Sequence, residues 1–395
     1  MRQNGIVELH IAEPLEELEA KIKKQKHQRW KRIIILIVST LMVIGGTYLL
    51  LNVQTYNRVR VVKKYESESA ENTKFIQFSN HIFKYGRDGA SLLNKNGKEI
   101  WNQSYQVKNP IVEISDKTAI IGDSGGTQIL VFDKNGMKGE IKTTVPIEKI
   151  SVSDQGIVAA LLKDETSPKV MCYDFAGNVL VEHEASINKM GCPLDISISK
   201  NGYMLLVTYL HMNGDSYSTN VAYYNFDRVG QSKTDKQVSY AEYSNTIMPM
   251  AFFMTESTSV IIGDQSILFY RGKQIPKMEK EITLDKRIKS VVHTNQYISL
   301  LLKNDNKKGY ELRVYNSNGT RIMSKDFVGE YSNIRMTDGE VLMYEGTKCN
   351  IYSVNGVNKF CGDLDVNIGN LIPIAGINKY MAINTKGIQE FQLVK

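Results

Sequence analysis

The chain has 395 residues, of which 42% are hydrophobic and 23% are charged, so it can form two or three domains or one large repeat domain. This composition excludes a mostly disordered chain, and four cysteines exclude a disulfide-dense scaffold. The formal net charge of +7 arises around a single apolar stretch, because residues 65–395 carry 37 basic and 37 acidic side chains. We therefore expect no nucleic-acid partner, since such a partner requires clustered positive charge on the folded body.

A run of 19 uncharged, mostly apolar residues extends from Ile33 to Leu51. At about 1.5 Å per residue, a helix of this length spans roughly the hydrocarbon core of a bilayer. The 32 residues before it are a long n-region for a cleaved signal peptide, and no small-x-small cleavage site follows Leu51. We therefore expect an uncleaved signal anchor, a single membrane span with its ends at Ile33 and Leu51.

Basic residues flank this apolar stretch on both sides. Residues 21–32 hold seven Lys or Arg side chains, whereas residues 58–64 hold four. This difference favours an N-terminus inside the cell. We expect a single-pass protein of the cell membrane, with its C-terminal domain extracytoplasmic. Its expected parts are a cytosolic tail (1–32), a transmembrane helix (33–51), a juxtamembrane segment (52–74) and an extracytoplasmic domain (75–395).

The sequence after the apolar stretch repeats one motif, in which an apolar strand runs into a turn that contains a glycine. The glycines recur at intervals of 37 to 53 residues, and most follow Asp or Asn, which favours tight hairpins. Two further strand-like stretches lie between successive motifs. Four short strands at about 40-residue spacing predict an all-β fold, a β-propeller. The turn glycines are Gly97, Gly136, Gly177, Gly230, Gly272, Gly319 and Gly356.

The number of blades depends on how the last repeat is completed. Seven full repeats extend from about Phe75 to Leu364, and three further strands follow before Lys395. The segment Val59–Tyr65, just after the apolar stretch, can supply the missing strand. A ring closed by strands from both ends of the chain removes open sheet edges. We therefore favour eight blades, with seven as the alternative, because the 53-residue interval before Gly230 indicates an irregular repeat.

The first repeat contains a tryptophan, Trp101, four residues after Gly97. This segment resembles the quinoprotein-type (PQQ-type) propeller repeat, in which a docking tryptophan stands at that position. The resemblance implies a docking role for Trp101, although the other repeats lack the tryptophan. The chain as a whole resembles a group of functionally uncharacterised, single-pass membrane-anchored propeller proteins of Gram-positive anaerobes.

No set of residues along the chain has the spacing of a catalytic or metal site. Residues 122–126 spell Gly-Asp-Ser-Gly-Gly, as around the nucleophile of chymotrypsin-like proteases. A protease also needs a histidine base, and His81 is the only upstream histidine in the extracytoplasmic part. Quinone-binding members of the repeat family use an adjacent cysteine pair, which this chain lacks. We expect no cofactor and no metal.

Two of the four cysteines, Cys349 and Cys361, flank a hairpin centred near Gly356. They form a disulfide if they face each other across the two strands. The alternative is two half-buried thiols, which strands accommodate well. A shift of one residue in strand register decides between these interpretations.

The function that we favour from sequence is a binding or scaffold module that holds a protein, peptide or cell-envelope ligand outside the membrane. The alternative is a propeller enzyme, a hydrolase or a cofactor-dependent dehydrogenase, with its site at the mouth of the central channel. A cluster of Asp, Glu and His at that mouth would favour the enzyme. Linear sequence cannot reveal such a cluster, because its members would come from different repeats.

Overall fold

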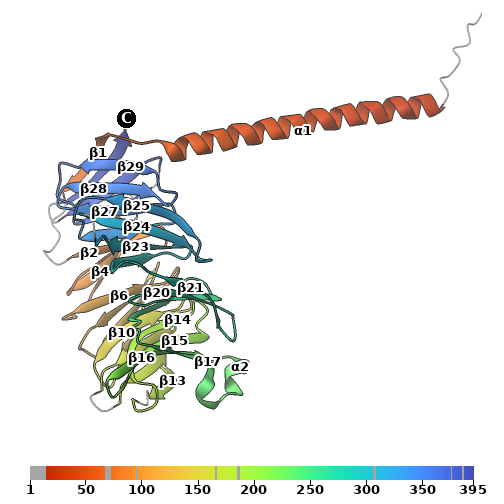
Figure 1. Cartoon of the computed structure of the whole chain (residues 1–395). Helices are drawn as coiled ribbons and strands as arrows, with labels where there is room; N and C mark the ends of the chain where they lie inside the picture. Colours follow the sequence, from red (N-terminus) through yellow and green to blue (C-terminus); the bar gives the residue numbers. More distant parts are fainter. Residues whose placement is uncertain are drawn as a thin grey trace, which may run out of the picture. The chain divides into compact units, whose positions relative to one another are not determined.

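The computed structural model divides the chain into an N-terminal unit that ends at Gln54 and a second unit from Thr55 to Lys395 (Figure 1). Residues 1–14, the first part of the expected cytosolic tail, lie outside the described residues. The structure describes residues 15–66, 73–94, 97–164, 167–184, 187–305, 308–374, 376–384 and 387–395.

The N-terminal unit contains one long helix, α1 (Leu15–Val53). Its segment Lys23–Thr47 is long and apolar enough to cross a membrane, with a mean hydropathy of 1.6. Within this segment the hydroxyl groups of Ser39 and Thr40 donate hydrogen bonds to the carbonyl of Leu36, at 2.9 and 2.8 Å. These hydroxyls are therefore satisfied inside the helix, as a bilayer interior requires. The helix also includes the basic residues that precede the expected span.

The second unit is an eight-bladed β-propeller, which confirms the favoured prediction. The described residues of this unit form eight four-stranded antiparallel sheets, each of which is one blade. Seven blades consist of strands that are consecutive in the sequence. In each of these seven, the first strand is an edge of the sheet and its partner within the sheet is the second strand.

Blades 1 to 4 extend from Lys74 to Ser244. Blade 1 consists of β2 (Lys74–Phe78), β3 (His81–Tyr85), β4 (Gly89–Leu93) and β5 (Glu99–Ser104). Blade 2 consists of β6 (Pro110–Ile114), β7 (Ala119–Asp123), β8 (Gln128–Asp133) and β9 (Gly136–Lys142). Blade 3 consists of β10 (Ile147–Val152), β11 (Val158–Leu162), β12 (Lys169–Tyr173) and β13 (Val179–Glu184). Blade 4 consists of β14 (Cys192–Ile198), β15 (Met204–Asn213), β16 (Ser216–Asn225) and β17 (Gln237–Ser244), with α2 (Arg228–Gln231) and the 3-10 helix η1 (Thr234–Lys236) before β17.

Blades 5 to 7 extend from Met250 to Asp363. Blade 5 consists of β18 (Met250–Phe253), β19 (Thr258–Ile262), β20 (Ser266–Arg271) and β21 (Lys277–Thr283). Blade 6 consists of β22 (Ile288–His293), β23 (Tyr297–Lys303), β24 (Tyr310–Asn316) and β25 (Arg321–Phe327). Blade 7 consists of β26 (Asn333–Met336), β27 (Glu340–Glu345), β28 (Lys348–Ser353) and β29 (Asn358–Asp363).

Blade 8 joins the two ends of the propeller unit. It consists of β30 (Asn370–Pro373), β31 (Lys379–Asn384), β32 (Gly387–Val394) and β1 (Arg58–Glu66). The strand β1 pairs antiparallel with β32, so that Val59 lies opposite Leu393 and Tyr65 opposite Ile388. In Figure 1, β1 accordingly lies among the blue strands from the other end of the chain. The outer strand of the last blade is thus the segment that immediately follows α1.

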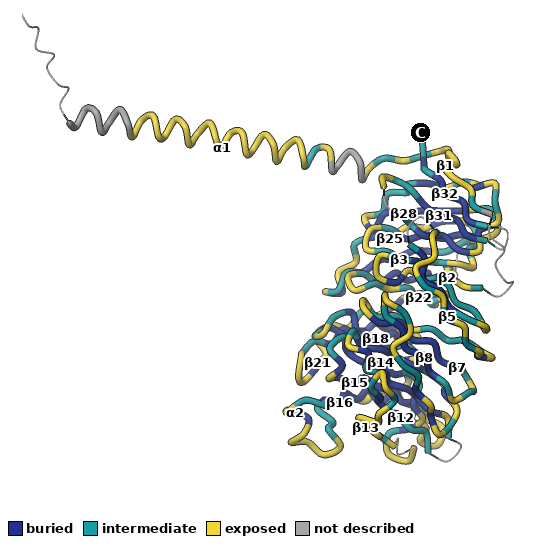
Figure 2. The backbone as a smooth tube through the Cα atoms, turned by 180° about the vertical axis from the view of Figure 1, so that it is seen from behind, coloured by how far each residue is buried: buried dark blue, intermediate teal, exposed yellow. Residues whose placement is uncertain are grey.

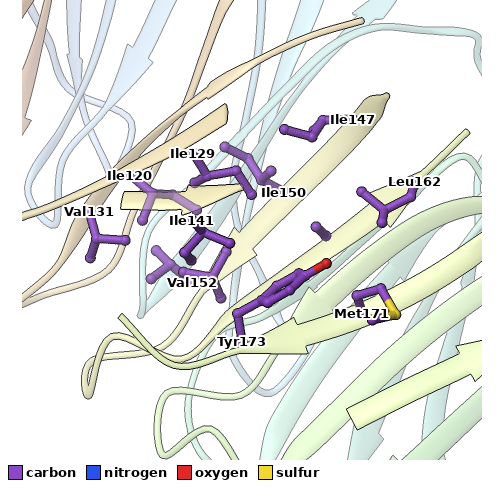
Figure 3. Close-up of a cluster of buried hydrophobic side chains, with 12 residues drawn as sticks. Ile120, Ile129, Val131, Ile141, Ile147, Ile150, Val152, Leu162, Met171 and Tyr173 are labelled. Carbon is purple, nitrogen blue, oxygen red and sulfur yellow. The ribbon is translucent and has the colours of Figure 1, made fainter. Parts of the chain in front are cut away.

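The hydrophobic core is divided among the boundaries between neighbouring blades. In the described residues, each of the eight boundaries holds one cluster of buried apolar side chains. Figure 3 shows the cluster between blades 2 and 3, and Figure 2 shows burial concentrated in the strands. The strand β11 is buried throughout because its side chains alternate between two boundaries. Ala160 packs toward blade 2, and Ala159 and Leu161 pack toward blade 4.

Six of the seven predicted turn glycines have positive φ, between 67° and 140°, as the hairpin interpretation requires. The exception is Gly230, which lies in α2. A Cβ at Gly230 would come within 1.6 Å of the carbonyl oxygen of Asn225, so close packing explains this glycine. The prediction of a hairpin at Gly230 was wrong because blade 4 carries α2 and η1 between its last two strands.

Candidate functional site

The first strands of the blades surround a central channel that contains three adjoining cavities. The acidic cavity, of about 510 Å³, is lined by blades 2 to 6. The middle cavity, of about 490 Å³, adjoins it at Ile114 and His293. The basic cavity, also of about 490 Å³, adjoins the middle cavity at Ile76, Ile334 and Arg335. Volumes of this size are typical of small-ligand sites.

The two end cavities differ in charge. The acidic cavity is lined by four carboxylates and two lysines, whereas the basic cavity is lined by Lys74 and Arg335 and by no Asp or Glu. The middle cavity is lined mainly by apolar side chains. The charged residues of the acidic cavity are Glu113, Asp116, Glu148, Asp195, Lys149 and Lys200.

Asp195 in β14 connects three blades across the acidic cavity. Its Oδ1 accepts a hydrogen bond of 2.8 Å from the Nζ of Lys149 in β10, and its Oδ2 accepts one of 2.8 Å from the backbone N–H of Ala251 in β18. Burial raises the pKa of Asp195, although the charge and hydrogen bond of Lys149 lower it. Asp195 and Lys149 are therefore occupied in holding neighbouring first strands together.

Two serines make similar links. Ser151 accepts a hydrogen bond of 3.0 Å from the N–H of Ile198 in the next blade, and Ser197 accepts one of 3.2 Å from the N–H of Phe253. Each serine stands one residue before the end of its first strand. Side chains at this position thus satisfy backbone donors of the neighbouring edge strand.

Glu113 stands at the same position in β6, but it makes no hydrogen bond or ion pair with any described residue. Its side chain is accessible from the cavity, yet protein surrounds it on all sides. This confinement raises the pKa of Glu113 to about 7. The negative charge of Asp195 adds to the rise, and the charge of Lys149 opposes it. Glu113 and Glu148 are therefore the two carboxyl groups of the cavity that make no hydrogen bond or ion pair with a described residue, and of these Glu113 is adjacent to Ile114, which also lines the middle cavity.

An aromatic pair forms another wall of the acidic cavity. The rings of Phe252 and His293 are stacked, with their centroids 3.6 Å apart and their planes at 4°. Burial lowers the pKa of His293 to about 4, so its imidazole is neutral at pH 7. The pair therefore presents an uncharged aromatic surface.

Side chains from opposite blades meet where the first strands turn into the second strands. Asp116 of blade 2 accepts a hydrogen bond of 2.6 Å from Lys200 of blade 4 and one of 3.1 Å from Asn295 of blade 6. Burial raises the pKa of Asp116, but these hydrogen bonds outweigh it and the net pKa is lowered. This end of the acidic cavity is thus crossed by a polar network.

Arg335 is the central residue of the basic cavity. Its Nη2 donates a hydrogen bond of 2.7 Å to the carbonyl of Phe75, and the Nδ2 of Asn370 donates one of 2.5 Å to the same oxygen. The Oδ1 of Asn370 has no hydrogen-bond partner, although the residue is only 5% exposed. Burial raises the pKa of the nearby Tyr85, the charge of Arg335 lowers it, and the charge of Glu113 raises it. Tyr85 is thus within electrostatic reach of both charged ends of the channel.

Trp101 lies in β5, outside the channel, and contacts blade 2. Its ring stacks on Phe132, with centroids 5.6 Å apart and planes at 5°, and also meets the edge of Phe83. Its indole N–H donates a hydrogen bond of 3.2 Å to the carbonyl of Lys134. The side chain therefore joins the outer strand of blade 1 to the strand β8 of blade 2.

The two cysteines considered for a disulfide do not face each other. Cys349 lies opposite Gly362 and Cys361 lies opposite Asn350, so their side chains point to opposite faces of the sheet. Cys349 is buried, Cys361 is exposed, and both are free thiols. The disulfide hypothesis is corrected by this register, which differs by one residue from the register that would pair the two cysteines.

The described residues offer little support for protease or metal chemistry. Ser124 follows β7 in a turn, where the carboxylate of the adjacent Asp123 accepts hydrogen bonds from the backbone N–H groups of Lys108 and Asn109, at 3.1 and 2.8 Å. The Asp-Ser-Gly-Gly segment therefore shapes a loop. Among the residues with described positions, no group of three or more His, Cys, Asp or Glu side chains is arranged to hold a metal ion.

The channel residues Glu113, Lys149, Asp195, His293 and Arg335 were not identified from the sequence. They come from five different blades and share no motif. Their common signal is position, because each lies in or at the end of the first strand of its repeat. The repeats were aligned on their hairpin turns. If they are aligned on their first strands instead, polar residues stand out within otherwise apolar strands.

The fold and channel define this protein as an eight-bladed β-propeller with an N-terminal apolar helix. The chain belongs to a family of unknown function (DUF5711), whose model matches residues 52–393. Comparison with curated proteins gives no match.

Solved structures show the same fold at low sequence identity. BamB from Moraxella catarrhalis aligns with 85% of this chain and 100% of its own, at 9% identity and a TM-score of 0.50. Sqt1 of Saccharomyces cerevisiae aligns with 86% of this chain and 100% of its own, at 12% identity and a TM-score of 0.52. The computationally designed Ika8 protein aligns with 86% of this chain and 100% of its own, at 9% identity and a TM-score of 0.50. These similarities concern the fold alone.

Proposed function

We propose that this protein is a membrane-anchored binding module, whose propeller holds a protein, peptide or cell-envelope ligand on the outer side of the membrane. The observation that carries the proposal is the central channel. Its cavities contain charged groups, Glu113 and Arg335, that are not fully occupied by contacts within the described residues. Such groups in concave sites are typical of ligand recognition.

The anchor in this proposal is α1. Its apolar segment and the excess of basic residues before that segment favour a single span with the N-terminus inside. Only residues 54–57 separate α1 from β1. In this proposal a short linker connects the span to the propeller, and the ligand would be one found in the cell envelope.

The likeness to BamB, Sqt1 and Ika8 supports a rigid ring as the scaffold for this function. A ring of blades presents loops from many repeats on two faces around one axis. A protein partner on a loop face and a small ligand in the channel are therefore compatible parts of one proposal.

The second candidate function is an enzyme with its site in the acidic cavity. Glu113 favours it, because a carboxyl group with a pKa of about 7 can act as a general acid or base near neutral pH. The other carboxylate of the cavity with a defined role, Asp195, is held by Lys149 and by the backbone of Ala251. This occupation makes a two-carboxylate hydrolase the weaker interpretation.

The test is crosslinking of the full-length protein in its own membranes, followed by purification and mass spectrometry. A reproducible envelope protein or cell-wall fragment supports the binding module. A matched purification of α1 alone, fused to an unrelated soluble domain, removes partners that bind only the anchor. Turnover of a substrate by the purified protein, abolished by Glu113→Gln, would instead establish the enzyme.

A further inference from the structure

We propose that the central channel binds a short peptide with free ends, whose ammonium group meets Glu113 and whose carboxylate meets Arg335. This inference rests on the proposed binding function and specifies its ligand class. The three cavities form a continuous series, because neighbouring cavities share lining residues. Their charge runs from acidic through apolar to basic along that series.

The acidic end selects a cation. Four carboxylates and two lysines line it, and both lysines are paired, Lys149 with Asp195 and Lys200 with Asp116. Glu113 has no partner among the described residues and faces the cavity. The stacked Phe252 and His293 add an aromatic surface, and His293 is neutral, so it does not repel an ammonium group. A bound ammonium would also favour the ionised form of Glu113.

The basic end selects an anion. Arg335 uses its Nη2 on the carbonyl of Phe75, and its remaining N–H groups make no hydrogen bond with the residues that the structure describes. No Asp or Glu lines this cavity. A guanidinium group with free N–H groups binds a carboxylate well, through paired hydrogen bonds.

The unpartnered Oδ1 of Asn370 is an independent sign of a ligand at this end. A buried amide oxygen without a partner is costly, and native proteins rarely leave one unsatisfied. In the basic cavity it lies near Arg335, since both side chains bond to the carbonyl of Phe75. The oxygen has almost no accessible surface in this structure, so the amide would have to rotate to accept an N–H from a ligand whose carboxylate binds Arg335, as the last peptide group of a chain supplies.

The middle cavity favours a peptide over other zwitterions. Its lining includes residues of first strands, which are edge strands, from blades 1, 2, 6, 7 and 8. Edge strands pair with extended peptides through their backbone groups. In β22, no described side chain occupies the backbone groups of the strand, in contrast to β14 and β18. Apolar side chains such as Ile114, Val292 and Ile334 can accommodate the side chains of the peptide.

The experiment uses immobilised full-length protein in detergent and a mixed pool of tetrapeptides, with retained peptides counted by mass spectrometry. Three versions of the pool are compared, with free ends, with N-acetylated ends and with C-amidated ends. We expect the free-ended pool to be retained at least tenfold better than either blocked pool. Equal retention of all three pools, or retention of none, would overturn the proposal.

Two variants assign the ends. Glu113→Gln should reduce retention of free-ended peptides about tenfold and abolish the penalty of N-acetylation. Arg335→Lys, which keeps the charge but loses the planar donors, should weaken the preference for a free carboxylate. The matched controls are Glu281→Gln in β21 and Arg321→Lys in β25, both exposed residues of outer strands that line none of the three cavities, and these should bind as the unmodified protein does. Peptide binding that neither channel variant alters would place the site elsewhere and refute the inference.

The result of the peptide experiment can be distinguished from the result of the crosslinking experiment that tests the proposed function. If channel variants lose peptides but still capture an envelope partner, the partner binds the loops and both proposals stand. If the protein captures a partner but retains no peptide, the inference fails alone.

Discussion

Asp116 of blade 2 accepts a hydrogen bond of 3.1 Å from the side-chain amide of Asn295 in blade 6, although four positions separate these blades in a ring of eight. The contact therefore crosses the axis of the propeller. Lys200 of blade 4 joins the same carboxylate at 2.6 Å. Three loops that are far apart in the sequence thus meet at one carboxylate.

Replacement of Asp116 by Ala should loosen this end of the channel. It removes two hydrogen bonds and leaves Lys200, which is 19% exposed, without its partner. We expect a loss of about 1–2 kcal/mol in the free energy of unfolding. The measurement is urea-induced unfolding of the full-length protein in detergent. Asp215→Ala, in the exposed tip of the β15–β16 hairpin, should leave the stability unchanged, and an equal loss there would contradict the prediction.

Trp101→Ala should destabilise the boundary between blades 1 and 2. It removes the stacking on Phe132 and the hydrogen bond to the carbonyl of Lys134. Because Trp101 is only partly buried, we expect a loss of about 2–3 kcal/mol. Trp101→Phe retains the ring and should lose about half as much. The chain has two tryptophans, so fluorescence of Trp101 in a Trp30→Phe background reports unfolding of this boundary directly.

Glu311 in β24 is a buried carboxylate, 6% exposed, that pairs with Arg313 and Lys286. Burial alone would raise its pKa, but hydrogen bonds from Arg313, Lys286 and Ser324 lower it to about 2. The group therefore stabilises the native state above pH 4.5, and this contribution is lost as the pH falls toward 2.

Glu311→Gln should cost about 2 kcal/mol at pH 7, because it weakens the charge-assisted hydrogen bonds from Arg313 and Lys286, although Arg313 keeps its ion pair with Asp285. Its melting temperature should also change less than that of the unmodified protein between pH 4.5 and pH 2. Thermal melts across that range test both statements. Parallel pH curves for the two proteins would show that Glu311 does not carry the acid sensitivity.

A disulfide between β1 and β32 should stabilise the ring. Arg60 lies opposite Gln392, and their side chains are hydrogen-bonded at 2.8 Å. Arg60→Cys combined with Gln392→Cys, in a background with Cys192→Ser and Cys361→Ser, should add up to about 5 kcal/mol when oxidised. The gain should vanish on reduction. The control pair Lys64→Cys and Gln392→Cys is out of register, so stabilisation by that pair would contradict the described pairing.

The native cysteines can report which side of the membrane holds the propeller. Cys192 and Cys361 are exposed, whereas Cys172 and Cys349 are buried, and burial raises the pKa of Cys172 to about 12. If the propeller is outside, a membrane-impermeant maleimide should label two thiols per chain in intact cells. The Cys192→Ser, Cys361→Ser double variant should take up no label until it is denatured. Labelling that begins only after permeabilisation would place the propeller inside.

The fold could be predicted because its signals are local. Positive φ at Gly97 and Gly356 is a property of single turns, and alternation along β11 is a property of five residues. The ring-closing position of Val59–Tyr65 followed from the count of strands. Blade 4 was harder, because α2 and η1 occupy the place of a turn.

The channel could not be predicted because its residues belong to different blades and come together only in the folded ring. Glu113 and Arg335 stand in strands that look like ordinary apolar first strands of a repeat. The closed ring places both residues around the central channel. The pKa of Glu113 depends on its surroundings in the folded ring, which the sequence does not show. The disulfide between Cys349 and Cys361 was wrongly considered for a related reason. The register between β28 and β29 is set by a bulge between Ile351 and Tyr352, and no residue pattern in the sequence predicts this bulge.

The pairing of β1 with β32 has a consequence for the order of folding during synthesis. Blades 1 to 7 are each built from consecutive strands, so each can form as its own residues emerge. The strand β1 emerges before all of them but finds its partner last, after Gly387 has been made. Until then both edges of the unfinished ring remain open. A chain whose synthesis stops before Gly387 would thus carry seven complete blades in a ring that cannot close.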